Sequence, residues 1–201
     1  MNAYDVVRIF ESEVAKYTDA PYAVAIESCS NALLLCCEYL KVKKVELPAN
    51  TYVSVPNAVI RAGGKIKFVD MKWSGAYRLH PYPIVDAAKR FTSGMYEPDT
   101  YMCVSFHGRK ILNAGRGGMI LTDDVEAVEW FKRARFDGRK EGVPIDEDDI
   151  NVLGHHVYMT PEQATAGLSR LLFLPKHNED MPEEDYGDLR KHSVFKEHYY
   201  E

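Results

Sequence analysis

The sequence predicts an α/β fold in which a mostly parallel sheet is covered by helices on both faces. Short apolar segments alternate with longer amphipathic segments through the first two thirds of the chain. The short segments are apolar at successive residues rather than at every second residue, which is typical of strands buried on both faces. Strands that alternate with helices favour parallel pairing, because each crossover helix returns the chain to the same edge.

The elements follow in order from periodicity and from end signals. Val6–Tyr17 is predicted to be an amphipathic helix, because its apolar residues recur at helical spacing. A strand at Tyr22–Ile26 follows, and the small polar residues after it open a helix at Ser28–Leu40. Pro48 ends the next predicted strand, Val45–Leu47.

A pair of glycines, Gly63 and Gly64, closes the next predicted helix, Val53–Ala62. Four further apolar segments are predicted to be strands: Ile66–Val69, Ile84–Val85, Met102–Phe106 and Met119–Thr122. Two later segments are predicted to be helices, Asp124–Arg135 from its periodicity and Pro161–Phe173 from the proline in its first turn.

The composition of the chain changes beyond Asp137. Gly138–Asn151 is acidic and contains glycine and proline, which indicates a loop, and Asn178–Asp188 is acidic and expected to be solvated. We therefore expect residues 1–175 to form one domain and residues 176–201 to form an acidic loop and C-terminal tail.

Composition and charge restrict the class of protein. A net charge of -5 argues against nucleic acid or an anionic membrane as the main partner. No apolar run reaches the roughly 20 residues of a membrane span, and Met1–Glu11 has no signal-peptide core. The cysteines lack paired zinc-ribbon spacing and lie in apolar segments, which predicts reduced thiols in a cytoplasmic protein.

Several common catalytic motifs are missing from the sequence. It has no G-x-x-x-x-G-K-[ST] loop, no G-x-G-x-x-G after the first strand and no H-E-x-x-H. The neighbours His155 and His156 do not share a helix face, and no carboxylate lies at ligand spacing. No metal site is predicted.

Chemically useful side chains follow the predicted strands. In an open α/β sheet, ligands bind beyond the carboxyl ends of the strands. The side chains at these ends are Ser28, Ser30 and Asn31 after the first strand, Asn50, Thr51 and Tyr52 after the second, Asp86 after Ile84–Val85, and Ser105 and Lys110 at the end of Met102–Phe106. One edge of the sheet thus gathers hydroxyls, an aromatic ring, a carboxylate and an amine.

This set of groups meets the requirements of pyridoxal phosphate. An amine forms a Schiff base with an aldehyde cofactor, and a carboxylate keeps a pyridine nitrogen protonated so that the ring accepts electrons. Hydroxyls and the free N–H groups of a helix N-terminus bind phosphate. An aromatic ring stacks on the cofactor ring.

The sequence resembles the DegT/DnrJ/StrS family of sugar aminotransferases, a branch of the fold-type I pyridoxal-phosphate enzymes. The most specific match is S-F-H-G-R-K at Ser105–Lys110, followed by G-R-G-G and T-D-D. Further similar segments are the N-terminal F-E and A-V pattern, S-C-S-N-A-L at Ser28–Leu33, the stretch Pro48–Asp70, and V-D-A-A at Val85–Ala88. Gly154–Leu171 is weakly similar to the helix that follows in the family.

The resemblance implies a role for each matched residue. Lys110 would be the Schiff-base lysine and general base, Asp86 would pair with the pyridinium, and Tyr52 would stack on the ring. Ser30, Asn31 and Ser105 would bind the phosphate. A homodimer with shared active sites is implied, and His156 occupies the position of the asparagine that reaches into the neighbouring site.

The sequence departs from the family pattern at several positions. Cys29 stands where the family has glycine, and Lys89 where it has glutamine or histidine. Only 15 residues separate Asp70 from Asp86, where family members have a further strand-helix-strand passage. The smaller C-terminal domain of the family is expected to be missing. Lys89 has two interpretations: it contacts a substrate or cofactor anion, or its charge lowers the pKa of Lys110.

Two functions from different classes follow from these observations. The first is an aminotransferase that moves an amino group from glutamate or glutamine to a keto sugar, by family analogy a nucleotide-linked one. The alternative is a cofactor-binding or structural dimer that keeps the fold without turnover. Local alternatives also remain, since Asp86 is a suitable N-cap for a helix, Ser28–Asn31 is a plausible helix start, and Tyr52 is compatible with core packing.

Overall fold

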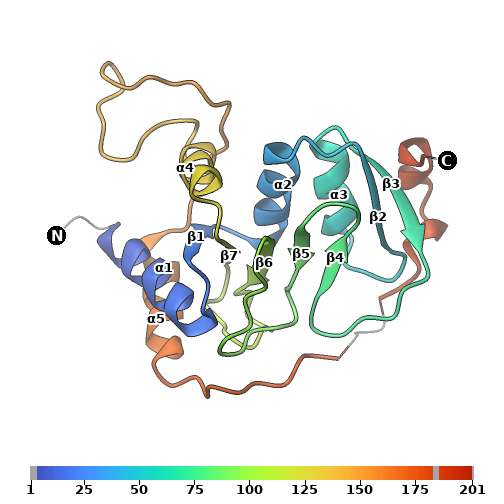
Figure 1. Cartoon of the computed structure of the whole chain (residues 1–201), viewed down its shortest axis with the longest axis horizontal. Coiled ribbons are helices and arrows are strands. Elements are labelled where there is room, and N and C mark those ends of the chain that lie inside the picture. The colour runs from blue at the N-terminus through green and yellow to red at the C-terminus, as the bar shows by residue number, and fades with distance from the viewer. Residues whose placement is uncertain (1–3, 183–185, 201) are drawn as a thin grey trace.

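The computed structural model of the chain describes residues 4–182 and 186–200. A five-stranded sheet forms its centre, with the strands in the order β1-β7-β6-β5-β4, and β2 and β3 form a separate pair beside it (Figure 1). The strands are β1 (Tyr22–Ile26), β2 (Lys44–Pro48), β3 (Lys65–Val69), β4 (Tyr77–Leu79), β5 (Ile84–Asp86), β6 (Tyr101–Ser105) and β7 (Gly118–Thr122). The helices are α1 (Asp5–Thr18), α2 (Cys29–Tyr39), α3 (Ser54–Arg61), α4 (Val125–Ala134) and α5 (Pro161–Leu171), followed by the short 3-10 helices η1 (Leu189–Lys191) and η2 (Ser193–His198).

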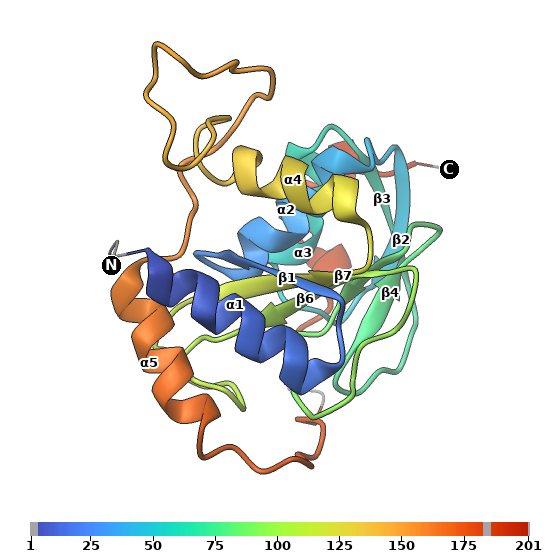
Figure 2. The same ribbon diagram turned by 60° about the vertical axis from the view of Figure 1, so that its left-hand side comes forward.

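Helices cover both faces of the central sheet, as the sequence predicts. Figure 2 shows α1 and α5 side by side on one face, with α2 and α4 on the other. Successive residues of a strand point to opposite faces. In β6, Cys103 belongs to the core under α2, α3 and α4, whereas Met102 and Val104 belong to the core under α1 and α5. Burial on both faces explains why these strands are continuously apolar.

The sheet is mixed, so the expectation of mostly parallel pairing needs correction. β5 and β6 are parallel, but β7 is antiparallel to both β1 and β6, and β4 is antiparallel to β5. The connections explain the difference. The connection from β4 to β5 is a short turn, residues 80–83, which returns the chain antiparallel, and residues 106–117 fold back from β6 into β7. The parallel strands β5 and β6 are joined by the longer crossover 87–100, which contains no helix. β4 itself was not predicted from the sequence.

Five strands nevertheless point the same way. β1, β5 and β6 share one direction, because β7 is antiparallel to both β1 and β6. An antiparallel bridge joins Glu46 of β2 to His80, directly after β4, which gives β2 and its parallel partner β3 the direction of β5. The carboxyl ends of β1, β2, β5 and β6 therefore meet at one edge of the fold.

Side chains predicted to start the helices form the caps. The hydroxyl of Ser28 accepts a hydrogen bond from the backbone N–H of Asn31, and the carboxylate of Asp124 accepts one from Ala127. Thr160 and Gln163 form a reciprocal capping box at the start of α5. The helices predicted from the sequence are confirmed to within two residues at each end.

The segment from Asn178 onward packs against the domain, which differs from the solvated loop and tail expected from its charge. The carboxylate of Asp180 binds the guanidinium of Arg90 at 2.7 Å, and Leu189 and Phe195 are buried in the core. In Figure 1 the chain that follows α5 runs below the central sheet. Part of the acidic stretch, residues 183–185, lies outside the described residues.

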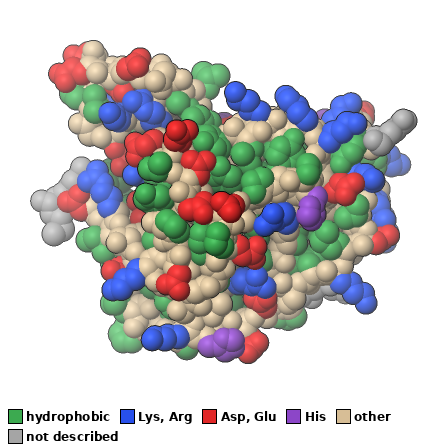
Figure 3. All heavy atoms as spheres, in the orientation of Figure 1, with side chains coloured by type: hydrophobic (Ala, Val, Ile, Leu, Met, Phe, Trp, Pro, Cys, Tyr) green, Lys and Arg blue, Asp and Glu red, His purple; other side chains and the backbone are tan. Residues whose placement is uncertain are grey.

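The predicted loop Gly138–Asn151 is confirmed, since it contains neither helix nor strand. It projects from the body of the molecule beside α4 (Figures 1 and 2). Figure 3 shows acidic and basic side chains interspersed over the face that Figure 1 presents, without a continuous field of one sign. No helix of the described part of the chain is long and apolar enough to cross a membrane.

Candidate active site

A cavity of about 390 Å³ opens at the shared carboxyl edge of β1, β2, β5 and β6. The family resemblance gives a role to seven residues, and five of them line the cavity, namely Ser30, Tyr52, Asp86, Ser105 and Lys110. These residues follow four different strands. The parallel direction of those strands brings the residues together.

Asp86 forms the buried floor of this cavity, with 6% of the residue exposed. One carboxylate oxygen accepts a hydrogen bond from the Tyr77 hydroxyl at 2.9 Å, and the other accepts one from the backbone N–H of Ala88 at 3.0 Å. The Tyr77 hydroxyl also contacts the Thr51 hydroxyl at 2.5 Å. Asp86 is the last residue of β5 and no helix follows it, so the helix N-cap interpretation is wrong.

Burial dominates the electrostatics of Asp86. It raises the pKa of this carboxyl above its usual value, because a charged group is less stable away from water. The Ala88 N–H, the Tyr77 hydroxyl and the charges of Lys110 and Lys89 oppose that shift in pKa. A buried carboxylate held by two donors and two nearby ammonium groups suits a cationic partner.

The start of α2 supplies the polar end of the cavity. Ser28 caps the helix and lines the cavity together with Ser30. Asn31 is not part of the lining, because its amide group donates a hydrogen bond to the carboxylate of Glu27 at 2.6 Å. The backbone of α2 passes very close to Gly118 of β7, where an added Cβ would lie 2.4 Å from the Cys29 nitrogen.

Lys110 lies in the connection between β6 and β7, which also forms part of the rim. Its backbone N–H donates to the His107 carbonyl at 2.8 Å, which forms a tight turn after Ser105. The Ser105 hydroxyl accepts a hydrogen bond from the His107 backbone at 3.4 Å. Both Ser105 and Lys110 line the cavity.

Aromatic residues that the sequence did not single out form the remaining wall. Trp73 and Tyr186 line the cavity beside Tyr52, and the ring centres of Tyr52 and Tyr186 are 6.2 Å apart. Tyr52 is 54% exposed, so it is not a core residue. Trp73 follows β3 at the same edge, so a search for candidate residues after the end of β3 would have found it. Tyr186 comes from the C-terminal segment, where no sequence signal marks it.

Lys89 is buried, with 1% of the residue exposed, yet it lines the cavity. Its ammonium donates a hydrogen bond to the carbonyl of Pro182 at 2.6 Å and lies 4.9 Å from the centre of the Tyr186 ring. A buried ammonium is stabilised by such carbonyl and ring contacts. Lys89 therefore ties the C-terminal segment to the cavity, and neither of the two interpretations of this lysine is tested by the contact.

The two remaining features are Cys29 and His156. Burial raises the pKa of the Cys29 thiol well above its usual range, so this residue is a neutral part of the lining. His156 lies outside the cavity lining and binds the carboxylate of Asp137 at 2.8 Å. The neighbouring His155 pairs separately with Glu38, so the two histidines do not converge.

Comparison with known proteins finds similarity to aminotransferases. The model of the DegT/DnrJ/EryC1/StrS aminotransferase family matches residues 1–95 and 84–183. A UDP-4-amino-4,6-dideoxy-N-acetyl-beta-L-altrosamine transaminase from Campylobacter jejuni is 22% identical over 89% of this chain and 59% of its own length. The chain thus spans about three fifths of that relative.

Solved structures share the fold. AtS13 from Actinomadura melliaura superposes with a TM-score of 0.77 at 19% identity, over 84% of this chain and 60% of that protein. The putative sugar aminotransferase Spr1654 from Streptococcus pneumoniae, in its PLP form, gives a TM-score of 0.71 at 18% identity, over 85% and 59% of the two chains. The family match covers more than half of the sequence, and the chain belongs to the DegT/DnrJ/EryC1/StrS aminotransferase family.

Proposed function

We propose that the chain carries the pyridoxal-phosphate site of a sugar aminotransferase, which moves an amino group from glutamate or glutamine to the keto group of a nucleotide-linked sugar. The observation that carries this proposal is the convergence of Asp86, Lys110, Ser30 and Ser105 on one cavity. Membership of the family and the transaminase from Campylobacter jejuni support it.

The donor set of the cavity fits this cofactor. Asp86 is a buried carboxylate suited to a ring nitrogen, and Ser30, in the first turn of α2, and Ser105, at the end of β6, both line the cavity. Tyr52 offers an exposed ring face. When bound, pyridoxal phosphate supplies an electron sink for the electron pair left behind when the substrate loses a proton.

Each residue of the chain has a distinct task in this proposal. The Asp86 carboxylate holds the ring nitrogen in its protonated form, and the hydrogen bonds from Tyr77 and Ala88 fix its orientation. The hydroxyls of Ser30 and Ser105, with the free N–H groups of α2, hold the phosphate. Lys110 Nζ takes the proton from the substrate carbon and returns it, a step that general bases accelerate by about 10²–10⁴-fold.

We also propose a homodimer with shared active sites, in which His156 contributes to the neighbouring cavity. His156 is exposed and lies at the base of the projecting loop, where it is accessible to a second copy. The backbone N–H of Asn31 donates to the Ser28 hydroxyl and its side-chain amide donates to Glu27, so in this proposal Asn31 supports the helix start that holds the phosphate. Residues 1–175 would form the cofactor-binding domain, with residues 176–201 as its C-terminal segment.

The test is covalent capture of the cofactor. The protein is incubated with pyridoxal phosphate, reduced with borohydride and analysed by peptide mass mapping. We expect the label on Lys110, no label at this position in Lys110→Ala, and an unchanged label in Lys72→Ala, whose exposed lysine lies outside the cavity. Release of 2-oxoglutarate from glutamate should fall by roughly 10³-fold in Lys110→Ala.

The outcomes separate the two functions considered. Label on Lys110 with 2-oxoglutarate release supports the aminotransferase. Label on Lys110 without release under any amino donor supports a cofactor-binding protein without turnover. Label scattered over surface lysines would contradict both cofactor-dependent functions and leave the structural dimer.

A further inference from the structure

A second cavity, of about 370 Å³, lies between α1, α4 and the start of the projecting loop. It shares no lining residue with the candidate active site. Six of its nine lining side chains are basic: Arg8, Lys132, Arg133, Arg135, Arg139 and Lys140. This concentration of cations stands out on a chain whose net charge is -5.

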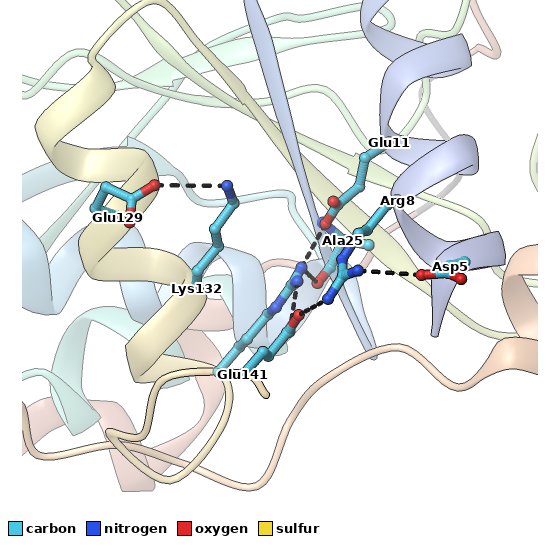
Figure 4. Close-up of polar contacts among 8 residues, drawn as sticks. Asp5, Arg8, Glu11, Ala25, Glu129, Lys132 and Glu141 are labelled. Carbon is cyan, nitrogen blue, oxygen red and sulfur yellow. Dashed lines mark hydrogen bonds and ion pairs between the residues drawn. The ribbon is translucent and has the colours of Figure 1, made fainter. Parts of the chain in front are cut away.

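Four of the six cations already have carboxylate partners. Arg135 is buried, and its guanidinium binds Glu11 at 2.5 Å and Glu141 at 2.9 Å. In Figure 4, dashed lines join Arg8 to both Asp5 and Glu141, and Lys132 to Glu129. Arg8 pairs with Asp5 at 3.1 Å, and Arg133 pairs with Asp148 at 3.5 Å. The charges of these four side chains are thus matched by carboxylates of the chain itself.

Arg139 and Lys140 are different. Among the residues that the structure describes, no carboxylate lies within ion-pair distance of either side-chain cation. The Arg139 guanidinium donates one hydrogen bond, to the Val143 carbonyl at 3.1 Å, and lies 5.7 Å from the centre of the Phe136 ring. Lys140 is exposed at the mouth of the cavity. Neither of these two adjacent positive charges is therefore matched by an ion pair within the described part of the chain, although the Asp148 carboxylate accepts a hydrogen bond from the Lys140 backbone N–H at 2.7 Å.

Unsatisfied donors gather at the same place. Within the described residues, three buried side-chain polar atoms lack a hydrogen-bond partner: Arg135 Nε, Arg139 Nε and the Tyr199 hydroxyl. Two of the three belong to arginines that line this one cavity. Buried donors are almost always hydrogen-bonded in folded proteins, so the folded chain leaves these two arginines incompletely hydrogen-bonded.

We propose that this cavity binds a multiply charged phosphate compound, held chiefly by Arg139 and Lys140. Guanidinium groups bind phosphate oxygens through paired hydrogen bonds, and a lysine adds a point charge. Two adjacent cations match a diphosphate group better than a single carboxylate. A volume of about 370 Å³ is within the range of small-molecule sites and leaves room beyond the phosphates. This proposal stands independently of the proposed function.

The experiment is calorimetric titration of the full chain with inorganic pyrophosphate at about 0.15 M salt, where exposed charges are screened beyond roughly 8 Å. We expect saturable binding that weakens at least tenfold in the double variant Arg139→Gln, Lys140→Gln. The matched control is Arg61→Gln, Lys65→Gln, which removes one exposed arginine and one exposed lysine that line neither cavity. Circular dichroism checks that both double variants are folded.

A third variant tests whether pyrophosphate binds at the candidate active site instead of this second cavity. Ser30→Ala with Ser105→Ala removes hydroxyls from the candidate active site and leaves the basic cavity intact. Binding that survives in this variant and is lost in the Arg139 and Lys140 variant supports the proposal. Absence of binding to the wild-type chain, equal weakening in the Arg61 and Lys65 control, or loss only in the serine variant would overturn it.

Discussion

At the scale of single residues, the candidate site depends on Asp86, a carboxylate that is buried although its charged form is more stable in water. Asp86 is buried at the floor of the cavity, and burial raises its pKa despite two hydrogen bonds and two nearby ammonium groups. A charged group that is costly to bury and yet lines a cavity is typical of a binding or catalytic site. Burial of the charged carboxylate lowers the stability of the folded chain, and a cationic partner bound beside it would offset that loss.

Asp86→Asn is expected to stabilise the chain without cofactor while removing its cofactor-dependent activity. Because the pKa of Asp86 is raised in the folded state, ionisation opposes folding at high pH. The destabilisation is complete above the folded pKa and disappears below the unfolded value of about 3.9. The variant should therefore melt roughly 2–4 °C higher at neutral pH, about 1 kcal/mol for a chain of this size. Thermal melts from pH 3 to 8 measure this.

The same melts contain their own control. The gain in melting temperature of Asp86→Asn should shrink as the pH falls through the folded pKa of Asp86. A gain that stays constant down to pH 3 would show that the carboxyl group is not the source. A loss of stability at every pH would mean that the hydrogen bonds from Tyr77 and Ala88 outweigh burial.

At the scale of elements, the site depends on how closely α2 approaches β7. The Ser28 cap fixes where the helix begins, and the missing side chain at Gly118 lets the helix start lie against the strand. An ideal Cβ at Gly118 would lie 2.4–2.8 Å from backbone atoms of Ser28 and Cys29, which have no flexible side chain to move aside. The position of Ser30, a predicted phosphate-binding residue at this helix start, thus depends on a glycine in β7.

Gly118→Ala is expected to displace the start of α2 and to lower stability by about 1–3 kcal/mol, the usual range for overpacking. Binding of pyridoxal phosphate should weaken, because Ser30 moves with the helix. Denaturant unfolding and cofactor titration measure the two effects. Gly63→Ala is the control for glycine replacement, since its Cβ would meet nothing within 4 Å, although its positive φ adds some strain. Equal cofactor affinity in both variants would contradict the proposed link.

At the scale of the whole molecule, a buried ion pair connects parts of the chain that are distant in sequence. Arg135, directly after α4, binds Glu11 of α1, the Ala25 carbonyl of β1 and Glu141 of the projecting loop. Glu11 also accepts a hydrogen bond from the Ala25 backbone N–H at 2.8 Å. One arginine thus joins both helical layers to the edge strand of the sheet.

Glu11→Ala is expected to lower the free energy of unfolding by about 3–5 kcal/mol, because it leaves a buried guanidinium without its nearest carboxylate. Asp5→Ala, which removes a partly exposed partner of Arg8, should cost less than about 1 kcal/mol. Urea unfolding measures both variants. Equal effects would show that the buried network holds the layers together no more strongly than a surface pair.

Local patterns predicted much of this protein. The apolar segments, the capping residues Ser28 and Asp124, and the glycines after Ala62 were enough to place the helices and strands, because each depends on neighbours within a few residues. The expectation that ligands bind beyond the carboxyl ends of the strands placed Asp86, Ser105 and Lys110 on one edge. It succeeded because the strands that bear them share a direction, even though the sheet as a whole is mixed.

Contacts between distant segments decided the rest. The reversal of β4 and β7 depends on which strands pair, and the burial of Lys89 depends on a carbonyl in the C-terminal segment. Tyr186 reaches the cavity from that segment, and Arg135 finds Glu11 across the sheet. Periodicity reports which face of an element is buried, but not what covers it. The sequence alone therefore determined the elements and the chemistry at their ends, whereas only the tertiary structure decided the partners of those groups.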